Sequence, residues 1–276
     1  MLRSTRDDNV AQPRMLANRR GARHSARMLD RMFRRSGHRR PPPEAPAGKR
    51  IYAVGDIHGR SDLLADIHRA IREDARGFAG ELVCVYVGDY IDRGPDSRGV
   101  IESLAARPLA GCRSHFLMGN HEDIMLRFLA DATVAPVWIM NGGGTTLDSY
   151  GVEWRDSAAD GFAAAQAALR RNLPDPHLRF LRALEPCHEE GGYLFVHAGI
   201  RPGRPVERQD PHDLMWIRDE FLYSTADHGH VVVHGHTIAE EPQLLDNRIG
   251  IDTGAYATGR LTCLVLEGAE RRILHT

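Results

Sequence analysis

Short apolar runs alternate along the chain with segments of helical periodicity. Residues 51–54, 82–87 and 115–118 have the unbroken hydrophobic character of buried strands, and each run ends beside a glycine. After the first run, Ser61 is typical of a helix N-cap, and the apolar positions that follow share one helical face: Leu63, Leu64, Ile67 and Ile71. A second helix is expected at 97–106. Strands that alternate with helices predict βαβ units, a mostly parallel sheet and therefore an α/β fold.

The alternation stops in the middle of the chain and resumes later. Helical patterns occupy residues 121–130, 158–171 and 176–184, and a glycine-rich loop at 141–146 lies between them. We interpret the stretch from about 121 to 190 as a helical insertion beside the functional site. Strands are then expected again, in four apolar runs: 193–197, 231–234, 249–252 and 261–266.

Charge separates the first residues from the rest. Residues 1–50 hold 14 Lys and Arg against four Asp and Glu, whereas the remainder holds 22 against 33. Such an arginine-rich head buries too little apolar surface to offset the entropy of ordering. We therefore expect a basic, disordered extension at 1–48 and one domain at 49–276. The charge leaves open that the extension binds an acidic partner, such as nucleic acid or anionic lipid.

Neither a membrane span nor a secretory leader is expected. No stretch approaches the roughly 18 consecutive apolar residues that a membrane helix needs. Arginine interrupts every apolar run near the start, and the four cysteines are far apart with no CxxC pair. These features predict a cytoplasmic protein.

The strongest chemical signal is a set of polar residues beside glycines at successive strand ends. Taken singly, each is ordinary: an aspartate there is often a turn residue, and a histidine on an apolar strand usually belongs to the core. Together they predict a functional site, because the carboxyl ends of parallel strands meet at one edge of a sheet. The five clusters are Gly55-Asp56-Ile57-His58-Gly59, Gly88-Asp89-Tyr90-Ile91-Asp92-Arg93-Gly94, Gly119-Asn120-His121-Glu122, His197-Ala198-Gly199 and His234-Gly235-His236-Thr237.

The order and spacing of these clusters resemble the metallophosphoesterase superfamily. The second and third clusters resemble its PPP branch, which includes the serine/threonine protein phosphatases. The resemblance covers residues 50–267, although generic phosphodiesterases of the superfamily end in Gly-His-x-His, and this chain has Thr237-Ile238 after Gly235-His236. It implies a calcineurin-like sandwich of two mixed β-sheets flanked by helices.

The resemblance also implies a dinuclear metal site with a bridging hydroxide as nucleophile. Asp56 and His58 are expected to bind one metal, and Asp89 is expected to bridge both. The second metal is expected to have three further ligands: Asn120, His197 and His236. These oxygen and nitrogen donors suit manganese, the expected metal, and also iron or zinc. His234 is expected to be a structural neighbour of the site.

Other residues of the clusters are expected to handle the phosphate and the leaving group. His121 would protonate the leaving alkoxide as general acid, with Asp92 orienting its ring. Arg93 would clamp the phosphoryl oxygens, together with Asn120 and with Arg218 of the segment 214–218. The alternative for Arg218 is a surface ion pair with one of the acidic residues that follow it.

The substrate is less constrained than the chemistry. Phosphoserine or phosphothreonine in protein is the leading hypothesis, and a phosphorylated small molecule also fits. Asp92 and Glu122 favour this branch over the alternative, a dinucleoside tetraphosphatase. A non-catalytic scaffold would have a broken site, which this chain does not have. The segment 138–144 would line the substrate groove or form a plain connection. Asp252 is expected to support the site, and Tyr256 to pack on the substrate.

Overall fold

The structure is a computed structural model that describes residues 43–106 and 108–276. Most of the expected basic extension therefore lies outside the described residues. Its last six residues, 43–48, are described and contact the domain: the Gly192 backbone N–H donates to the Glu44 carbonyl at 3.0 Å, and the Ala45 N–H donates to the Gly268 carbonyl at 2.8 Å.

Ten strands in the described residues form two five-stranded sheets. The first sheet has the order β10-β9-β1-β2-β3, in which β1, β2 and β3 are parallel and β9 and β10 run antiparallel to their neighbours. Its strands are β1 (Lys49–Val54), β2 (Glu81–Tyr86), β3 (Cys112–Phe116), β9 (Thr262–Glu267) and β10 (Glu270–His275).

The second sheet has the order β4-β5-β6-β8-β7, with a parallel centre of β5, β6 and β8 between antiparallel edges. Its strands are β4 (Cys187–Glu190), β5 (Tyr193–Val196), β6 (Val231–His234), β7 (Gln243–Leu244) and β8 (Arg248–Gly250). The expectation of one mostly parallel sheet is thus replaced by two mixed sheets, as the family resemblance implied. The strands that periodicity missed, β4, β7 and β10, are antiparallel edge strands with short or charged sequences.

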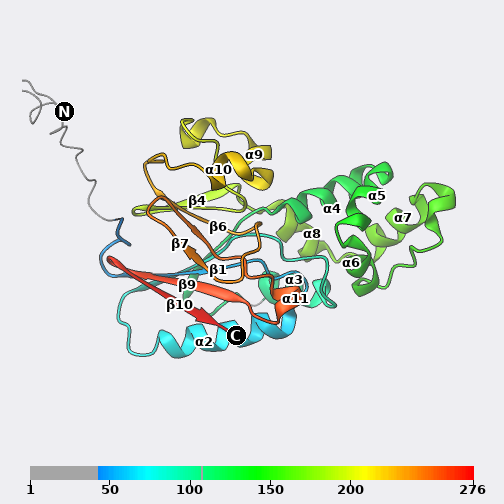
Figure 1. Cartoon of the computed structure of the whole chain (residues 1–276). Coiled ribbons are helices and arrows are strands. Elements are labelled where there is room, and N and C mark those ends of the chain that lie inside the picture. The colour runs from blue at the N-terminus through cyan, green and yellow to red at the C-terminus, as the bar shows by residue number, and fades with distance from the viewer. Residues whose placement is uncertain (1–42, 107) are drawn as a thin grey trace, which may run out of the picture. The chain divides into compact units, whose positions relative to one another are not determined.

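Alternating side chains on the strands build separate cores on the two faces of each sheet. Ile51 and Ala53 of β1 face the second sheet, where they join a cluster with Phe195 and Val233. Their neighbours Tyr52 and Val54 point the other way, toward helices. The outer face of the second sheet packs in the same manner against the short helices α9 (Pro211–Trp216) and α10 (Asp219–Leu222). The result is the four-layer order helix, sheet, sheet, helix (Figure 1).

Two helices follow the first two strands and pack on the outer face of the first sheet. They are α2 (Ser61–Asp74) and α3 (Ser97–Ala106), and the four apolar residues predicted for the buried face of α2 are buried. The N-cap prediction was wrong: Arg60 holds that position, and the Ser61 hydroxyl donates instead to Asp96 Oδ2 at 2.6 Å.

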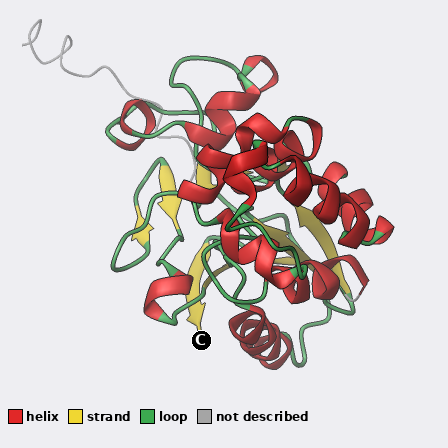
Figure 2. Cartoon of the chain, turned by 90° about the vertical axis from the view of Figure 1, so that its right-hand side faces the viewer, coloured by secondary structure: helices red, strands yellow, loops and turns green. Residues whose placement is uncertain are grey.

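The middle of the chain is helical, as predicted, and gathers at one end of the sheets (Figures 1 and 2). Its α-helices are α4 (Asn120–Ala130), α5 (Ala135–Met140), α6 (Gly143–Ser149), α7 (Ala163–Asn172) and α8 (Asp175–Arg182). The glycine-rich segment is not a loop beyond Gly142, because α6 begins at Gly143, which packs against the Trp138 indole. Within the described part of the chain, no helix is both long and apolar enough to cross a membrane.

Candidate active site

The predicted metal ligands converge where strands of both sheets end. Asp56 follows β1, Asp89 follows β2 and Asn120 opens α4 just after β3. His197 and His236 follow β5 and β6 of the second sheet. All of the predicted ligands are at least nine-tenths buried. Burying a polar group costs free energy unless it has a hydrogen-bond or metal partner, so these side chains need such partners.

Asp89 lies between two groups of potential ligands. Its Oδ2 atom is 3.5 Å from His58 Nε2 and 3.8 Å from His121 Nε2. Its Oδ1 atom faces the other side, 3.4 Å from His197 Nε2, in a group that also contains His236. One carboxylate with an oxygen toward each group has the geometry that a bridging ligand requires.

The imidazoles are held with their Nε2 atoms toward the Asp89 carboxylate, and we call the space around this carboxylate the centre. His58 Nδ1 is 2.8 Å from the Ile91 carbonyl and His197 Nδ1 is 2.9 Å from the Val87 carbonyl. A carbonyl only accepts hydrogen bonds, so each Nδ1 carries the proton and each Nε2 keeps its lone pair. Asn120 Oδ1 completes this side at 3.0 Å from His197 Nε2.

Three buried atoms of these residues have no hydrogen-bond partner among the described residues: Asp56 Oδ1, His58 Nε2 and His236 Nε2. The other oxygen of Asp56 accepts from the His236 backbone N–H at 2.9 Å. Buried polar atoms without partners are costly in a folded protein. Two of these atoms belong to residues of the two groups of potential ligands that share Asp89, in which the ligand atoms lie within 4.8 Å of one another: His58 in one group and His236 in the other. The residues present therefore fit a site for divalent cations.

Electrostatics agree with this fit. Burial lowers the pKa of His58 to about 3 and that of His236 to about 2, which keeps both rings neutral, the form that binds metals. Burial is the main cause that raises the pKa of Asp56 well above its ordinary value, and repulsion from the Asp252 and Asp89 carboxylates adds to it. A bound cation would relieve that repulsion between carboxylates.

The backbone at these residues adopts conformations that side chains disfavour. His58, Asp89, Asp92, Arg93 and His236 have φ values of 47°, 52°, 72°, 66° and 63°. Non-glycine residues in this left-handed region cost about 1–3 kcal/mol each and persist only where the surroundings enforce them. The strained residues therefore lie in the turns that position the predicted ligands and the neighbouring Asp92 and Arg93.

Glycines beside the ligands allow the backbone to approach the carboxylates. A Cβ atom on Gly119 would lie 2.2 Å from Asp89 Oδ1, and one on Gly235 would lie 1.9 Å from Asp56 Oδ1. Neither distance is compatible with a side chain. At Gly119 and Gly235, this close contact explains why the sequence clusters contain glycine.

His121 and Asp92 form a buried pair. His121 Nδ1 lies 2.7 Å from Asp92 Oδ2, and its Nε2 atom faces the centre, 3.2 Å from Arg93 Nη2. The Arg93 guanidinium lies 5.0 Å from the centroid of the Tyr256 ring, which is a cation–π distance. Tyr256 therefore contacts the predicted phosphate-binding arginine.

Glu122 ties the second and third clusters together. Its Oε2 atom accepts from the Asp89 N–H at 2.9 Å and the Gly119 N–H at 3.1 Å. Its Oε1 atom accepts from Tyr90 N–H at 2.8 Å. The side chain thus fixes the turn that carries Asp89, and this is an orienting contact.

Arg218 and His234 occupy different positions relative to the centre. Arg218 is exposed at the rim, and its Nη1 donates to Thr237 Oγ1 at 3.2 Å, beside His236. Of the acidic residues that follow it, Glu220 pairs with Arg201. The His234 ring is buried, and its centroid is 5.1 Å from that of the Phe221 ring. Burial lowers the pKa of His234 to about 4. This packing is compatible with the structural role expected for His234, which stays a prediction.

Two functional contacts were missed by sequence reasoning, and both come from the helical insertion. The Trp138 indole N–H donates to Asp92 Oδ2 at 2.9 Å, and the Thr146 hydroxyl donates to Asp92 Oδ1 at 2.6 Å. Gly142 between them accepts from the Arg93 backbone N–H at 3.3 Å. The segment 138–144 therefore contacts Asp92 and Arg93, and only its position in the sequence next to the predicted site hinted at this.

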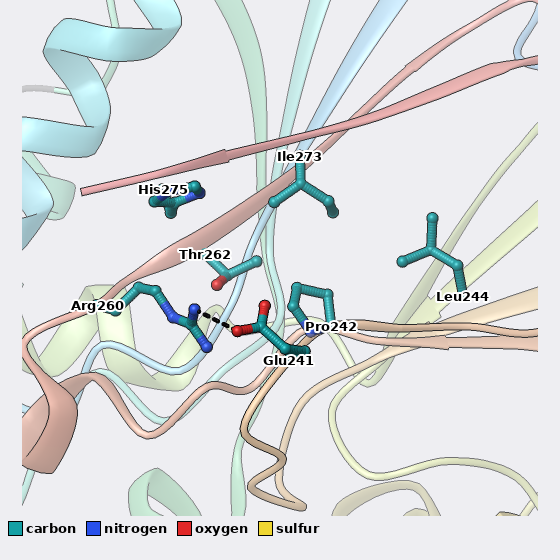
Figure 3. A pocket seen from close by; sticks show the side chains of 7 residues that line it. All are labelled: Glu241, Pro242, Leu244, Arg260, Thr262, Ile273 and His275. Atoms are coloured by element: carbon teal, nitrogen blue, oxygen red, sulfur yellow. Dashed lines mark hydrogen bonds and ion pairs between the residues drawn. The ribbon is translucent and has the colours of Figure 1, made fainter.

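A cavity of about 240 Å³ lies away from these residues. It opens between the sheet edges, where Arg260 and Glu241 form an ion pair with Nη1 and Oε1 2.9 Å apart (Figure 3). None of the predicted metal ligands lines this cavity, and neither Arg93 nor Arg218 does. Its lining consists of Glu241, Pro242, Leu244, Arg260, Thr262, Ile273 and His275. The cavity is therefore separate from the candidate active site.

A third group of potential metal ligands, His115, Glu185 and His188, also lies elsewhere, near β3 and β4. The two imidazole rings stack with centroids 3.6 Å apart and planes only 21° from parallel, so their in-plane lone pairs do not converge. Arg113 Nη1 adds positive charge 2.8 Å from His115 Nε2. We interpret this group as part of the ion-pair network between the sheet edges.

Comparisons with known proteins agree with this geometry. The model of the calcineurin-like phosphoesterase family matches residues 49–258. The chain is 31% identical over 227 residues to serine/threonine-protein phosphatase 1 of Salmonella typhimurium, covering 79% of this chain and 93% of the relative. It is 26% identical over 237 residues to the asymmetrical bis(5'-nucleosyl)-tetraphosphatase PrpE of Bacillus cereus, covering 76% and 88%.

A solved structure of a protein assigned provisionally as a diadenosine tetraphosphatase has the same fold. It superposes with a TM-score of 0.55 at 24% identity and covers 84% of this chain and 98% of its own. The family match extends over most of the chain and includes every predicted metal ligand. The chain therefore belongs to the calcineurin-like phosphoesterase family, whose members are metal-dependent hydrolases of phosphate esters.

Proposed function

We propose that this phosphoesterase hydrolyses phosphate monoesters of serine and threonine in proteins. The observation that carries the proposal is the buried His121–Asp92 pair, with His121 Nε2 facing the centre beside Arg93. An alkoxide of serine or threonine is a poor leaving group and needs a proton as the P–O bond breaks. A general acid contributes about 10²–10⁴-fold to such a step. A phosphoanhydride releases a stabilised phosphate and gains less from this proton.

The predicted ligands would hold two divalent ions. Asp56 and His58 would hold one ion, Asp89 would lie between the two, and the second would be held by Asn120, His197 and His236. Manganese is our first choice because the donors are oxygen and nitrogen, and iron and zinc fit the same donors. When bound, such ions activate water as a nucleophile and stabilise charge on the phosphoryl oxygens.

The remaining residues have roles in binding and proton transfer. Once a bound phosphate accepts from the Arg93 guanidinium in place of His121, His121 would hold a proton at Nε2 and deliver it to the leaving oxygen. Asp92 accepts from Nδ1–H and keeps the ring oriented. Arg93 would bind two phosphoryl oxygens through its forked guanidinium. Arg218 would approach from the rim, and the Asn120 amide would contact the same phosphate.

The second candidate function is hydrolysis of dinucleoside tetraphosphates. It is favoured by the similarity to the asymmetrical bis(5'-nucleosyl)-tetraphosphatase of Bacillus cereus and by the fold shared with the solved structure described above. Both functions would use the same ligands and arginines. They differ in how strongly the reaction depends on the leaving-group proton from His121.

Steady-state hydrolysis in the presence of Mn²⁺ separates the two functions. We expect a phosphoserine peptide to have a higher kcat/KM than diadenosine tetraphosphate, and the His121→Asn variant to lose about 10²–10⁴-fold on the peptide. A preference of tenfold or more for the dinucleotide, about 1.4 kcal/mol in transition-state binding, would establish the second candidate instead. No turnover of either compound with any of the three metals would support the scaffold alternative.

A further inference from the structure

The Asp92 carboxylate is fully buried and accepts hydrogen bonds at both oxygens. Its Oδ2 atom receives two donors, His121 Nδ1 at 2.7 Å and Trp138 Nε1 at 2.9 Å. Its Oδ1 atom is 2.6 Å from Thr146 Oγ1. Among the described residues, no arginine or lysine forms an ion pair with Asp92, so this buried carboxylate depends on such donors for its solvation. The donors other than His121 are 46 and 54 residues away in the sequence, on α5 and α6.

Trp138 is held rigidly. Its side chain is fully buried, and its ring centroid is 5.0 Å from that of Phe128 on α4. Gly143 presses against the indole, because a Cβ atom there would lie 2.6 Å from three of its ring carbons. The indole N–H therefore has a fixed direction, and it points at the oxygen that orients His121.

The proton of the Thr146 hydroxyl can be assigned by counting. Its Oγ1 atom has three polar neighbours: Asp92 Oδ1 at 2.6 Å, Ser97 Oγ at 2.8 Å and the Asp92 backbone N–H at 3.0 Å. A hydroxyl has one proton, and a charge-assisted bond is the shortest and strongest use of it. Thr146 thus donates to the carboxylate and accepts from the Asp92 N–H, while Ser97 supplies the remaining proton.

We propose that Trp138 and Thr146 are positioning residues for the catalytic acid. They hold the Asp92 carboxylate in the one orientation in which it accepts from His121 Nδ1–H. The helical insertion would thereby control proton delivery by His121, and not only form a wall of the substrate groove. The proposal rests on the role of His121 in the proposed function.

This arrangement has a consequence that depends on the leaving group. If either donor is lost, the carboxylate rotates or draws in water, and His121 holds its proton in a less productive direction. An alkyl phosphate, with its poor leaving group, then reacts more slowly. An aryl phosphate such as para-nitrophenyl phosphate releases a stabilised phenolate and depends less on the acid. A structural defect alone would slow both reactions to the same extent.

The experiment compares kcat/KM for a phosphoserine peptide and for para-nitrophenyl phosphate in the Mn²⁺-loaded full chain. For W138F and T146V we expect kcat/KM for the peptide to fall about tenfold more than kcat/KM for the aryl phosphate. Loss of a residue that orients a direct ligand in a metal site typically costs about 10–100-fold, and we expect a similar size here. T146S keeps the hydroxyl and should restore the wild-type ratio of the two rates. Metal content and thermal unfolding are measured for every variant.

Two matched controls come from the same insertion. Trp154 donates from Nε1 to the exposed Asp148 at 2.9 Å, and the Thr145 hydroxyl donates to the Gly142 carbonyl at 3.0 Å. W154F and T145V lose the same kinds of hydrogen bond away from Asp92, so the ratio of the two rates should not change. If W138F does not fold, the T146V and T146S pair still tests the proposal.

Equal losses on both substrates in W138F and T146V, or no rescue by T146S, would overturn the positioning role. His121→Asn distinguishes this result from failure of the proposed function. If His121→Asn slows the peptide selectively and the two positioning variants do not, His121 is the acid and only the further inference is wrong. If His121→Asn slows both substrates equally, the general-acid role itself is wrong.

Discussion

The carboxyl ends of the strands and the helical insertion contribute to the same centre in different ways. The strand ends supply the predicted ligands through short turns, in which an aspartate or histidine lies within a few residues of its strand. The insertion supplies Trp138 and Thr146, which reach Asp92 across 46 and 54 residues. The first region is encoded locally, whereas the second depends on how helices pack. Changes in the two regions should therefore have different effects.

Among changes at a predicted metal ligand, at the rim and in the insertion, Asp89→Asn is expected to have the largest effect, because Asp89 faces both groups of ligands. Loss of its charge should remove bound metal and about 4 kcal/mol of transition-state stabilisation, or about 10³-fold in kcat/KM. Metal analysis and steady-state kinetics check this. Asp66→Asn on the surface of α2 is the control. An Asn variant that retains two metals per chain would contradict the bridging role.

Arg218→Ala is expected to have an intermediate effect that does not involve the metals. Arg218 lies at the rim beside Thr237, so its removal should raise KM for the phosphopeptide by about tenfold, as for loss of a charge-assisted contact. Metal content should remain that of the wild type. Arg208→Ala, in the nearby η3 turn (Val206–Arg208), should have no effect on KM. An unchanged KM in Arg218→Ala would mean that Arg218 does not contact the phosphate.

Gly142→Ala is expected to have the smallest effect on activity and tests the contact of the insertion with Arg93. Gly142 has φ +99°, and a Cβ atom there would lie 2.8 Å from Arg93 Cγ. We expect a stability loss of about 2–3 kcal/mol and a fall in kcat/KM of about threefold. Gly161→Ala, at φ +66° with open space around it, should lose roughly 1 kcal/mol and no activity. Equal kinetics in both variants would show that the Gly142 contact does not position Arg93.

The sequence by itself determined the strand-end chemistry. Asp56, His58 and Asp89 could be placed at a predicted site because glycine, aspartate and histidine follow apolar runs at short and fixed spacing, and the resemblance implied their roles as metal ligands. The resemblance then supplied the two mixed sheets, which the alternation of strands and helices did not predict. Local patterns suffice here because a strand end and its turn are formed by neighbouring residues.

Only the tertiary structure decided the remainder. Strands β4, β7 and β10 exist because a neighbouring strand offers backbone partners, not because their own sequences favour strands. Helix α6 forms from a glycine-rich segment because packing against Trp138 outweighs the low helix propensity of glycine. The donors to Asp92 also escaped prediction, since hydrogen bonds between residues about fifty positions apart leave no periodicity in the sequence.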